Sequence, residues 1–231
     1  MNDSDRDVLQ QGIAENVALI RKRIEAAARR SRRDAGSVKL IAVTENFPAA
    51  TVRAAYGCGL RDFGENRVQE AEAKFGELAD LRPDLTLHLI GHLQTNKVKD
   101  ALKLFDIIHS VDSVKLVQEI SNRAAGKVPV LIEVNVAGEE SKFGLSEEQL
   151  RNTITATGGM PNIEIRGLMT VAPYVEDAEE VRPVFAELKR LNDSFGFTEL
   201  SMGMTDDFEV AIEEGATMIR VGRAIFGERR Y

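Results

Sequence analysis

The sequence predicts an α/β fold, a single closed (β/α)8 barrel of the TIM type with an additional N-terminal helix. Short runs of apolar and β-branched residues alternate with helical segments, which favours parallel strands joined by right-handed crossovers. Eight such runs are present, the number that closes a barrel of this type. A length of 231 residues suits one barrel domain over 1–231, and the chain contains no linker, low-complexity tract or repeat.

The expected elements follow one another along the chain. Apolar residues recur at helical spacing over about 8–33, which predicts a long amphipathic helix at the N-terminus. The predicted strands are 38–44, 62–64, 85–90, 107–111, 129–135, 163–169, 199–202 and 218–221. The predicted helices lie near 49–57, 67–79, 95–103, 114–125, 147–157, 177–195 and 206–214.

An open, doubly wound sheet is the competing fold. Such a sheet usually carries a glycine-rich dinucleotide loop after its first strand. Residues 44–48 read Thr-Glu-Asn-Phe-Pro and contain no glycine. We therefore prefer the closed barrel.

The barrel predicts where a site lies, because barrel sites form at the carboxyl ends of the strands. Polar residues gather at these ends, as a ligand site requires. They are Thr44, Glu45, Asn46, Glu65, Asn66, His92, Gln94, Thr95, Asn96, Asp112, Asn135, Thr170, Ser201, Thr205, Arg220 and Arg223.

Two segments near the end of the chain predict an anion site. Residues 201–207 and 218–223 each read as a strand that runs into a turn containing glycine, with a helical segment beyond. Such turns expose backbone N–H groups, and a following helix adds the positive end of its dipole. The most plausible ligand is a phosphate group, which the Arg220 side chain could also reach.

Composition excludes several classes of protein. The hydrophobic fraction of 43% and the charged fraction of 29% are typical of a globular protein. A net charge of −7 argues against general nucleic-acid binding. The basic cluster over 21–33 is a local exception, and its helical spacing favours a solvated face over an RNA or membrane patch.

The same composition indicates the cytoplasm. Cys58 is the one cysteine, so no internal disulfide can form, and its surroundings suggest a packing residue. We expect no membrane association, because no apolar run approaches the roughly 18 residues that span a bilayer. The acidic start of the chain does not resemble a secretion signal.

Several stretches together resemble the pyridoxal-phosphate (PLP) homeostasis protein family. They are LIAVTENFPA (40–49), RDFGENRVQEAEAK (61–74), HLIGHLQTNKVK (88–99), SVD (110–112), VLIEVNVAGEESKFG (130–144), IRGLMT (165–170) and LSMGMTDDFEVAIEEGATMIRVGRAIFG (200–227). They span nearly the whole chain in the family's order. The resemblance implies the single-domain barrel of alanine racemase-like, fold-type III PLP proteins, with PLP as cofactor and a role in vitamin B6 homeostasis.

One position departs from the family. Its members carry a lysine after the first strand that forms a Schiff base with PLP, and here that position is Glu45. A carboxylate has no nucleophilic amine, so the resemblance implies that PLP binds this chain non-covalently or not at all. Glu45 is either a natural divergence or an engineered replacement. If another lysine were used, Lys142 would be the first to test.

The resemblance also implies roles for the predicted site residues. Ser201 would bind the PLP phosphate with its hydroxyl, and the backbone N–H groups of Gly222 and Arg223 would complete the cradle. Arg220 would face the pyridine nitrogen and, because a guanidinium only donates hydrogen bonds, would hold it unprotonated. Asn66 would contact the ring oxygen or the end where the lysine attaches, and Met169 would pack on one face of the ring.

Each role has a structural alternative. Ser201 could cap a helix, Gly222 could be a plain turn glycine, and Arg220 could form a salt bridge with Glu213 or Glu214. Asn66 could be the N-cap of the helix that starts at Arg67. Met169 could be an ordinary core residue. We assign His92 no catalytic role and expect His88 and His109 to be buried structural residues, while Asp206 and Asp207 suit the first turn of a helix.

Three functions compete. The first is a PLP-binding homeostasis protein that holds the cofactor or hands it to PLP-dependent apoenzymes without robust catalysis. The second is a racemase-like PLP enzyme of the same fold, which we disfavour because only 224–231 follow the last strand and position 45 is not lysine. The third is a PLP-independent phosphate-binding barrel with Glu45 as general base. We prefer the first, and we expect a monomer.

Overall fold

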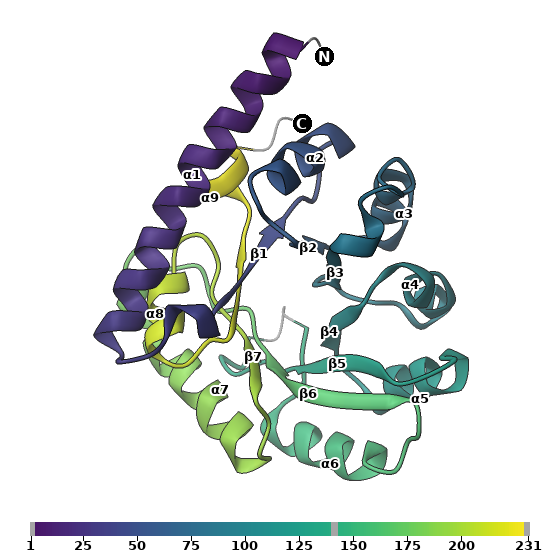
Figure 1. Cartoon of the computed structure of the whole chain (residues 1–231). Helices are drawn as coiled ribbons and strands as arrows, with labels where there is room; N and C mark the ends of the chain where they lie inside the picture. Colours follow the sequence, from purple (N-terminus) through teal and green to yellow (C-terminus); the bar gives the residue numbers. More distant parts are fainter. Residues whose placement is uncertain (1–2, 140–142, 229–231) are drawn as a thin grey trace.

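The chain folds as a closed barrel of eight parallel strands, and the computed structural model describes residues 3–139 and 143–228. Each strand pairs with the next along the chain, and β1 pairs with β8 to close the ring. The helices lie outside the strands, with α1 along one side of the barrel (Figure 1). The predicted fold class is confirmed.

All eight predicted strands are present, with ends that differ from the prediction by a few residues at most. They are β1 (Lys39–Val43), β2 (Asp62–Glu65), β3 (Thr86–Leu89), β4 (Ile107–Val111), β5 (Val128–Glu133), β6 (Ile163–Met169), β7 (Glu199–Ser201) and β8 (Met218–Val221). The α-helices are α1 (Asp3–Arg30), α2 (Ala49–Gly57), α3 (Val68–Gly76), α4 (Val98–Leu104), α5 (Val114–Arg123), α6 (Glu147–Thr157), α7 (Arg182–Ser194), α8 (Phe208–Glu213) and α9 (Arg223–Phe226). Short 3-10 turns are η1 (Ala35–Ser37), η2 (Arg82–Asp84), η3 (Thr95–Lys97) and η4 (Ala178–Val181). The single-turn helix α9 is the helical segment expected beyond residues 218–223.

Local sequence explains where several helices begin. At the start of α6, the Ser146 hydroxyl accepts a hydrogen bond from the Gln149 amide, and the Gln149 side chain accepts one from the Ser146 amide. This reciprocal capping box satisfies two backbone donors that the helix itself cannot. Ser113 caps α5 in a similar way, by accepting from the Leu116 amide.

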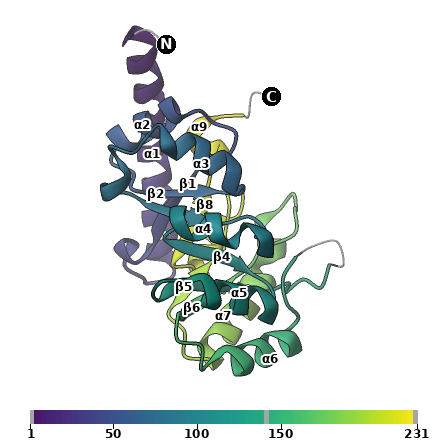
Figure 2. The ribbon, with the colours of Figure 1, turned by 90° about the vertical axis from the view of Figure 1, so that its right-hand side faces the viewer.

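Helix α1 covers the seam at which β8 meets β1. Its apolar stripe of Ile13, Val17, Ile20 and Ile24 is buried, and it packs on α2, α8 and α9 (Figures 1 and 2). The basic cluster over 21–33, predicted to form a solvated face, is partly paired, because three of its arginines contact α8. Arg23 pairs with Glu209 at 3.1 Å, Arg30 pairs with Glu213 at 2.5 Å, and Arg33 donates to the Ile212 carbonyl at 2.7 Å.

The apolar core has two parts. The larger lies between the strands and the surrounding helices, and the smaller is an inner cluster of Ile41, Leu131, Met169 and Met218. His88, His109 and Ser201 are also fully buried on the strands. Among the described residues, no helix combines the length and apolar character needed to cross a membrane.

Candidate functional site

A cavity of about 820 Å³ opens at the carboxyl ends of the strands. This carboxyl-end cavity lies where barrel folds place their sites. Of the predicted site residues, Asn66, Arg220, Gly222 and Arg223 line it. Glu45, Met169 and Ser201 are buried and are not among the residues that line it.

Arg220 projects from β8 and is almost fully buried, with 4% of its surface exposed. One guanidinium nitrogen, Nη1, donates to Ser201 Oγ at 2.6 Å, and Nη2 donates to the Thr170 carbonyl at 2.8 Å. Burial lowers the pKa of Arg220 to about 10, with Asp207 and Glu133 opposing the shift. The guanidinium therefore still carries its charge at neutral pH.

The alternative of a salt bridge from Arg220 to Glu213 or Glu214 is wrong. Both carboxylates pair with Arg182 instead, at 2.7 and 2.6 Å. They lie at the end of α8 on the outer layer of the protein, whereas Arg220 belongs to the barrel strands. Within the described ranges Arg220 forms no ion pair with a carboxylate, and it directs its charge to the cavity that it lines.

Ser201 ends β7 and has no exposed surface. Its hydroxyl lies between two buried side chains, at 2.6 Å from Arg220 Nη1 and 2.9 Å from His109 Nδ1. Helix α8 begins several residues later with Asp207 as its N-cap, so Ser201 is not a helix cap. Its contact with a phosphate stays a prediction.

Gly222 and Arg223 connect β8 to α9 at the cavity wall. Gly222 is the N-cap residue of α9, and the amides of Gly222 and Arg223 have no hydrogen-bond partner in the described part of the chain. Unpaired amides are expected here, because the first turn of a helix lacks internal acceptors. A Cβ on residue 222 would lie 3.2 Å from the Val43 carbonyl oxygen, which shows how closely β1 and β8 approach at this turn.

Two aspartates flank this turn and differ in role. Asp206 forms an ion pair with Arg223, in which Nη2 donates to both carboxylate oxygens at 2.5 and 2.6 Å. Asp207 is buried and accepts from the Met204 amide at 2.5 Å, an interaction that stabilises the turn after β7. Asp207 is the N-cap residue of α8, but its carboxylate makes no capping bond to the helix.

Glu45 follows β1 and is buried, with 7% of its surface exposed. Its carboxylate accepts a hydrogen bond of 2.7 Å from the Asn66 side chain, so Asn66 connects Glu45 to the cavity. The alternative role of Asn66 as a helix N-cap is wrong, since Arg67 occupies that position. Glu45 is followed by Asn46, which adopts a positive φ of 63° and donates its amide to Glu70.

A buried lysine supports the backbone beneath Glu45, and sequence reasoning missed it. Lys74 on α3 donates to the Thr44 carbonyl at 2.6 Å, to Glu65 at 2.8 Å and to Glu70 at 3.0 Å. The Thr44 hydroxyl also donates to Glu65. Burial raises the pKa of Glu65, although Lys74 opposes the shift. This cluster fixes the turn that carries position 45.

Met169 lies at the end of β6 in the inner apolar cluster with Ile41, Leu131 and Met218. Its surface is 1% exposed, as expected for the core alternative considered from the sequence. Contact between Met169 and a cofactor ring stays a prediction.

The cavity also contains an acidic residue that sequence reasoning missed. Glu133 ends β5, lines the cavity and is buried. Burial, aided by the charge of Asp112, raises the pKa of Glu133 to about 7, while Arg220 opposes the shift. A carboxylate at a strand end could have identified Glu133 as a site residue, but the predicted strand 129–135 extends past it, so Glu133 was counted as part of that apolar strand.

One edge of the cavity is formed by a ring stack. His92 and Phe143 stack with ring centroids 4.2 Å apart, and His92 Nδ1 lies 3.1 Å from Asp112. Phe143 comes from the segment after β5, next to residues 140–142. Lys142, the first alternative lysine, lies outside the described residues.

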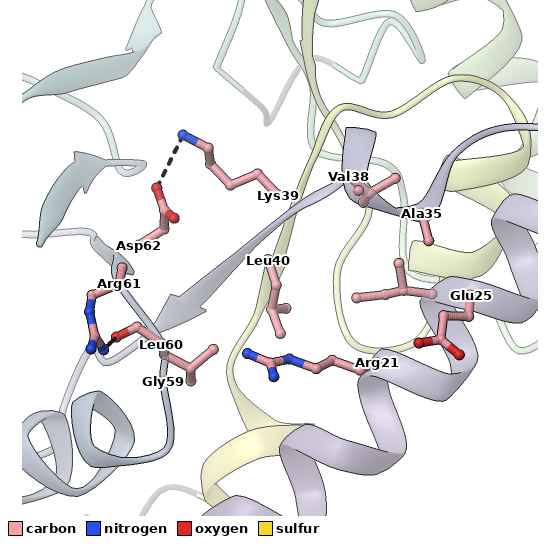
Figure 3. A pocket seen from close by; sticks show the side chains of 12 residues that line it. Arg21, Glu25, Ala35, Val38, Lys39, Leu40, Gly59, Leu60, Arg61 and Asp62 are labelled. Carbon is pink, nitrogen blue, oxygen red and sulfur yellow. Dashed lines mark hydrogen bonds and ion pairs between the residues drawn. The ribbon is translucent and has the colours of Figure 1, made fainter.

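A second cavity, of about 490 Å³, lies at the opposite, amino ends of β1 and β2. Figure 3 shows its side chains, which include Arg21 and Glu25 of α1 and the ion pair between Lys39 and Asp62. It is remote from the residues predicted to bind a ligand. In the described ranges, no group of three or more His, Cys, Asp or Glu side chains is placed to hold a metal ion.

Comparisons with known proteins agree with this geometry. The family described as alanine racemase, N-terminal domain, matches residues 10–230. The pyridoxal phosphate homeostasis protein of Aquifex aeolicus is 45% identical over 226 residues, which are 94% of this chain and 98% of that protein. The chain belongs to the pyridoxal phosphate homeostasis protein family. The resemblance deduced from the sequence motifs is confirmed.

Solved structures support the same assignment. PipY of Synechococcus elongatus, solved with PLP bound, is 41% identical with a TM-score of 0.82, over 93% of this chain and all of that one. A Bifidobacterium adolescentis protein of unknown function is 38% identical with a TM-score of 0.90, over 98% and 97% of the two chains. Alanine racemase from Corynebacterium glutamicum, 17% identical with a TM-score of 0.72, shares the fold over 95% of this chain and 62% of its own.

Proposed function

We propose that this chain binds pyridoxal 5'-phosphate in the carboxyl-end cavity and acts in PLP homeostasis, holding or delivering the cofactor without robust catalysis. The observation that carries the proposal is the buried, charged Arg220 beside the unpaired amides of Gly222 and Arg223, in a chain of this family. A buried cation and a pair of free donors suit a ligand that has a phosphate at one end and a ring nitrogen at the other.

The amides of Gly222 and Arg223 would hold the phosphate. The close approach of Gly222 to Val43 leaves space for a bare backbone but little for a side chain, which fits a cradle of amide donors. Ser201 is the predicted third member, and because its hydroxyl contacts His109 and Arg220, it would have to turn its proton away from His109 to reach the phosphate. Arg223 would add positive charge if it exchanged its Asp206 partner for the phosphate.

Arg220 would face the pyridine nitrogen. Bound PLP supplies an electron-accepting ring, and a guanidinium, which only donates hydrogen bonds, keeps the ring nitrogen unprotonated and weakens that capacity. The anchoring of Arg220 by Ser201 and the Thr170 carbonyl holds its charge in one place. This environment suits a carrier better than an enzyme of deep carbanion chemistry.

Glu45 would prevent covalent attachment at the family's lysine position, because a carboxylate has no amine to react with an aldehyde. Asn66 donates a hydrogen bond from its side chain to Glu45 and also lines the cavity, where its side chain would contact the ligand. The racemase-like alternative has support only from distant relatives, at 17% identity or less in the racemases compared. We therefore do not develop it.

The test compares the protein with its Glu45→Lys variant. We expect the unmodified chain to bind PLP reversibly in equilibrium dialysis, with no cofactor fixed to it by borohydride. The variant should gain a yellow absorption band and a borohydride-fixed cofactor on the peptide that contains position 45. Glu45→Gln is the matched control, because it removes the charge without adding an amine.

Two results would change the proposal. Absence of PLP binding in both the unmodified chain and Glu45→Lys would refute it. Borohydride fixation in the unmodified chain would mean that another lysine reacts, and Lys142→Arg is the first variant to examine.

We also propose PLP-dependent apoenzymes as recipients, a monomeric chain and a cytoplasmic location, with no nucleic-acid or membrane partner. The net charge of −7 supports the absence of a nucleic-acid role. Transfer can be measured by the recovery of activity in an apoenzyme after addition of the loaded protein, and mass by light scattering. Recovery no faster than with free PLP at the same concentration would argue against delivery.

A further inference from the structure

A continuous file of polar side chains crosses the inside of the barrel. It begins at Asp62 of β2, passes through His88 of β3 and His109 of β4, and ends at Ser201 of β7, which binds Arg220. The contacts are Asp62 Oδ1 to His88 Nε2 at 3.0 Å, His88 Nδ1 to His109 Nε2 at 2.9 Å, and His109 Nδ1 to Ser201 Oγ at 2.9 Å. Both histidines and Ser201 have no exposed surface.

The file connects the two ends of the barrel. Asp62 lies in the amino-end cavity, where it also pairs with Lys39 at 3.2 Å (Figure 3). Arg220 lies at the other end, in the carboxyl-end cavity. Sequence analysis predicted that His88 and His109 are buried structural residues, which the structure confirms, but it did not connect them to the site.

The chemistry of the end groups, with neutral histidines between them, sets the direction of the hydrogen bonds. Burial would raise the pKa of Asp62, but the hydrogen bond from His88 and the charge of Lys39 outweigh it and hold that pKa below its usual value. Asp62 is therefore an ionised acceptor, and His88 must donate from Nε2. Burial, with the charge of Arg220 acting in the same direction, lowers the pKa of His109 well below its usual range, so His109 is neutral.

A neutral histidine has one donor and one acceptor nitrogen. With His88 neutral as well, donation from its Nε2 leaves Nδ1 as an acceptor, and His109 must donate to it from Nε2. His109 Nδ1 is then an acceptor, and the Ser201 hydroxyl must donate to it. The serine oxygen is left with its lone pairs for Arg220, which can only donate.

The opposite direction would be costly. If His109 donated to Ser201, His88 would donate to His109 and turn an unprotonated Nε2 toward the Asp62 carboxylate. Two acceptors would then face each other at 3.0 Å in the barrel interior, unless a further proton were bound there. With both histidines neutral, the contacts therefore specify one arrangement of protons, whereas a doubly protonated His88 would reverse the hydrogen bonds to His109 and Ser201.

We propose that Asp62, His88 and His109 are positioning residues for Arg220: in the ligand-free protein they commit the Ser201 hydroxyl proton to His109, so that the serine oxygen faces Arg220 as an acceptor. A freely rotating hydroxyl would at times direct its proton at the guanidinium, and the hydrogen bond from Arg220 to the serine oxygen would then break. The file thereby holds the Arg220 guanidinium, which the proposed function places against the cofactor ring. To that extent the inference rests on the proposed function.

The first test needs no ligand and no variant. NMR of the ligand-free protein with 15N-labelled histidine at pH 7 should show both buried rings neutral, with the proton on Nε2 and none on Nδ1. The third histidine, His92, is exposed at the cavity edge and can be assigned with a His92→Asn variant. A proton on Nδ1 of either buried ring, or a doubly protonated ring, would overturn the proposal.

The second test measures whether the file holds Arg220. The readout is the exchange with water of the Arg220 Nη hydrogens, assigned by loss of their signal in Arg220→Lys. His109→Phe keeps a ring without nitrogen, and Asp62→Leu removes the terminal acceptor. Both variants should loosen the hydrogen bond from Arg220 Nη1 to Ser201. Because such a bond contributes about 0.5–1.5 kcal/mol, the Arg220 Nη hydrogens should exchange with water about tenfold faster. Asp62→Asn keeps an acceptor oxygen and should restore slow exchange.

Variants are compared only after circular dichroism confirms that they fold. If His109→Phe does not fold, Asp62→Leu and Asp62→Asn, at the partly exposed end of the file, carry the comparison. Unchanged exchange in a folded file-breaking variant would show that the histidines only fill space, and would refute the proposal.

PLP affinity gives a third readout. His109→Phe should weaken PLP binding by about fivefold, and the effect should vanish in a Ser201→Ala background, because the two residues act through one hydrogen bond. If the unmodified chain binds no PLP, the proposed function fails, while the tautomer and exchange measurements still decide this inference. Equal effects in both backgrounds would contradict it.

Discussion

At the residue scale, an ion pair competes for the proposed phosphate site. Asp206 holds the Arg223 guanidinium with two bonds of 2.5 and 2.6 Å, at the turn whose amides are unpaired. Both side chains are about half exposed, with 49% of the Arg223 surface and 57% of the Asp206 surface accessible. Because an exposed pair contributes little to stability, a bound phosphate can displace the carboxylate at low cost.

We therefore predict that Asp206→Asn raises the affinity for PLP about two- to fivefold, in line with the small free energies of exposed ion pairs. Isothermal titration calorimetry at low salt would measure it. Glu228→Gln is the matched control, since Glu228 lies farther from Arg223, at 3.8 Å. An equal gain in both variants would indicate a general charge effect instead of release of Arg223 from its partner.

Glu133 gives the site a pH dependence. Its pKa is raised to about 7 by burial and by Asp112, so the folded state keeps a proton that the unfolded state has released. This contribution to stability is present below the unfolded pKa and is lost as the pH rises through about 7. Above that pH the carboxylate also adds negative charge to a cavity proposed to bind an anion.

We expect Glu133→Gln to gain stability relative to the unmodified protein as the pH rises from 5 to 8, measured by thermal unfolding. PLP affinity should fall over the same range in the unmodified protein and change less in the variant. Glu164→Gln, at a half-exposed position on β6, controls for loss of a surface charge. Parallel pH profiles for Glu133→Gln and the unmodified protein would show that Glu133 does not titrate in this range.

At the element scale, the turn between β8 and α9 forms the proposed phosphate cradle. It is shaped by close packing against β1, because a Cβ on Gly222 would meet the Val43 carbonyl at 3.2 Å. The backbone of Gly222 has φ −116°, which any residue can adopt. A glycine is therefore favoured here by space and not by conformation.

It follows that Gly222→Ala should fold but bind PLP more weakly, by roughly fivefold if one amide hydrogen bond is distorted. Equilibrium dialysis with PLP and with inorganic phosphate would measure the change. The control is Gly159→Ala, where an added Cβ meets no atom within 4 Å. Unchanged phosphate affinity in Gly222→Ala would place the anion elsewhere in the cavity.

Sequence reasoning succeeded where the signal is local. Strand and helix periodicity specified the barrel, and the strand-end rule located Arg220, Gly222, Arg223 and Asn66 at one cavity. It failed where contacts depend on how strands meet across the ring. The contact of His109 with Ser201 joins positions 92 residues apart, and no local pattern encodes it.

At the scale of the whole barrel, α1 covers the seam between β8 and β1 and supports the helix after the proposed cradle. Asn16 donates to the Ile225 carbonyl of α9 at 2.9 Å, and Val17 is buried beside it with 3% of its surface exposed. A seam of this kind joins the first and last strands, so its loss should affect the whole ring and not one segment. This makes α1 a test of the prediction that 1–231 is one domain.

We predict that Val17→Asp lowers the free energy of unfolding by about 3 kcal/mol or more, because it buries a carboxylate without a partner. Leu19→Asp is the matched control on the same helix, since Leu19 is 59% exposed, and its stability should be nearly unchanged. Urea unfolding followed by circular dichroism and by a fluorescent probe attached at Cys58 would measure both. A single domain requires the two signals to change at the same urea concentration in Val17→Asp. Separate transitions would show that α1 and its neighbours unfold independently of the remaining strands, and the seam would then be a local contact without influence on the distant half of the barrel.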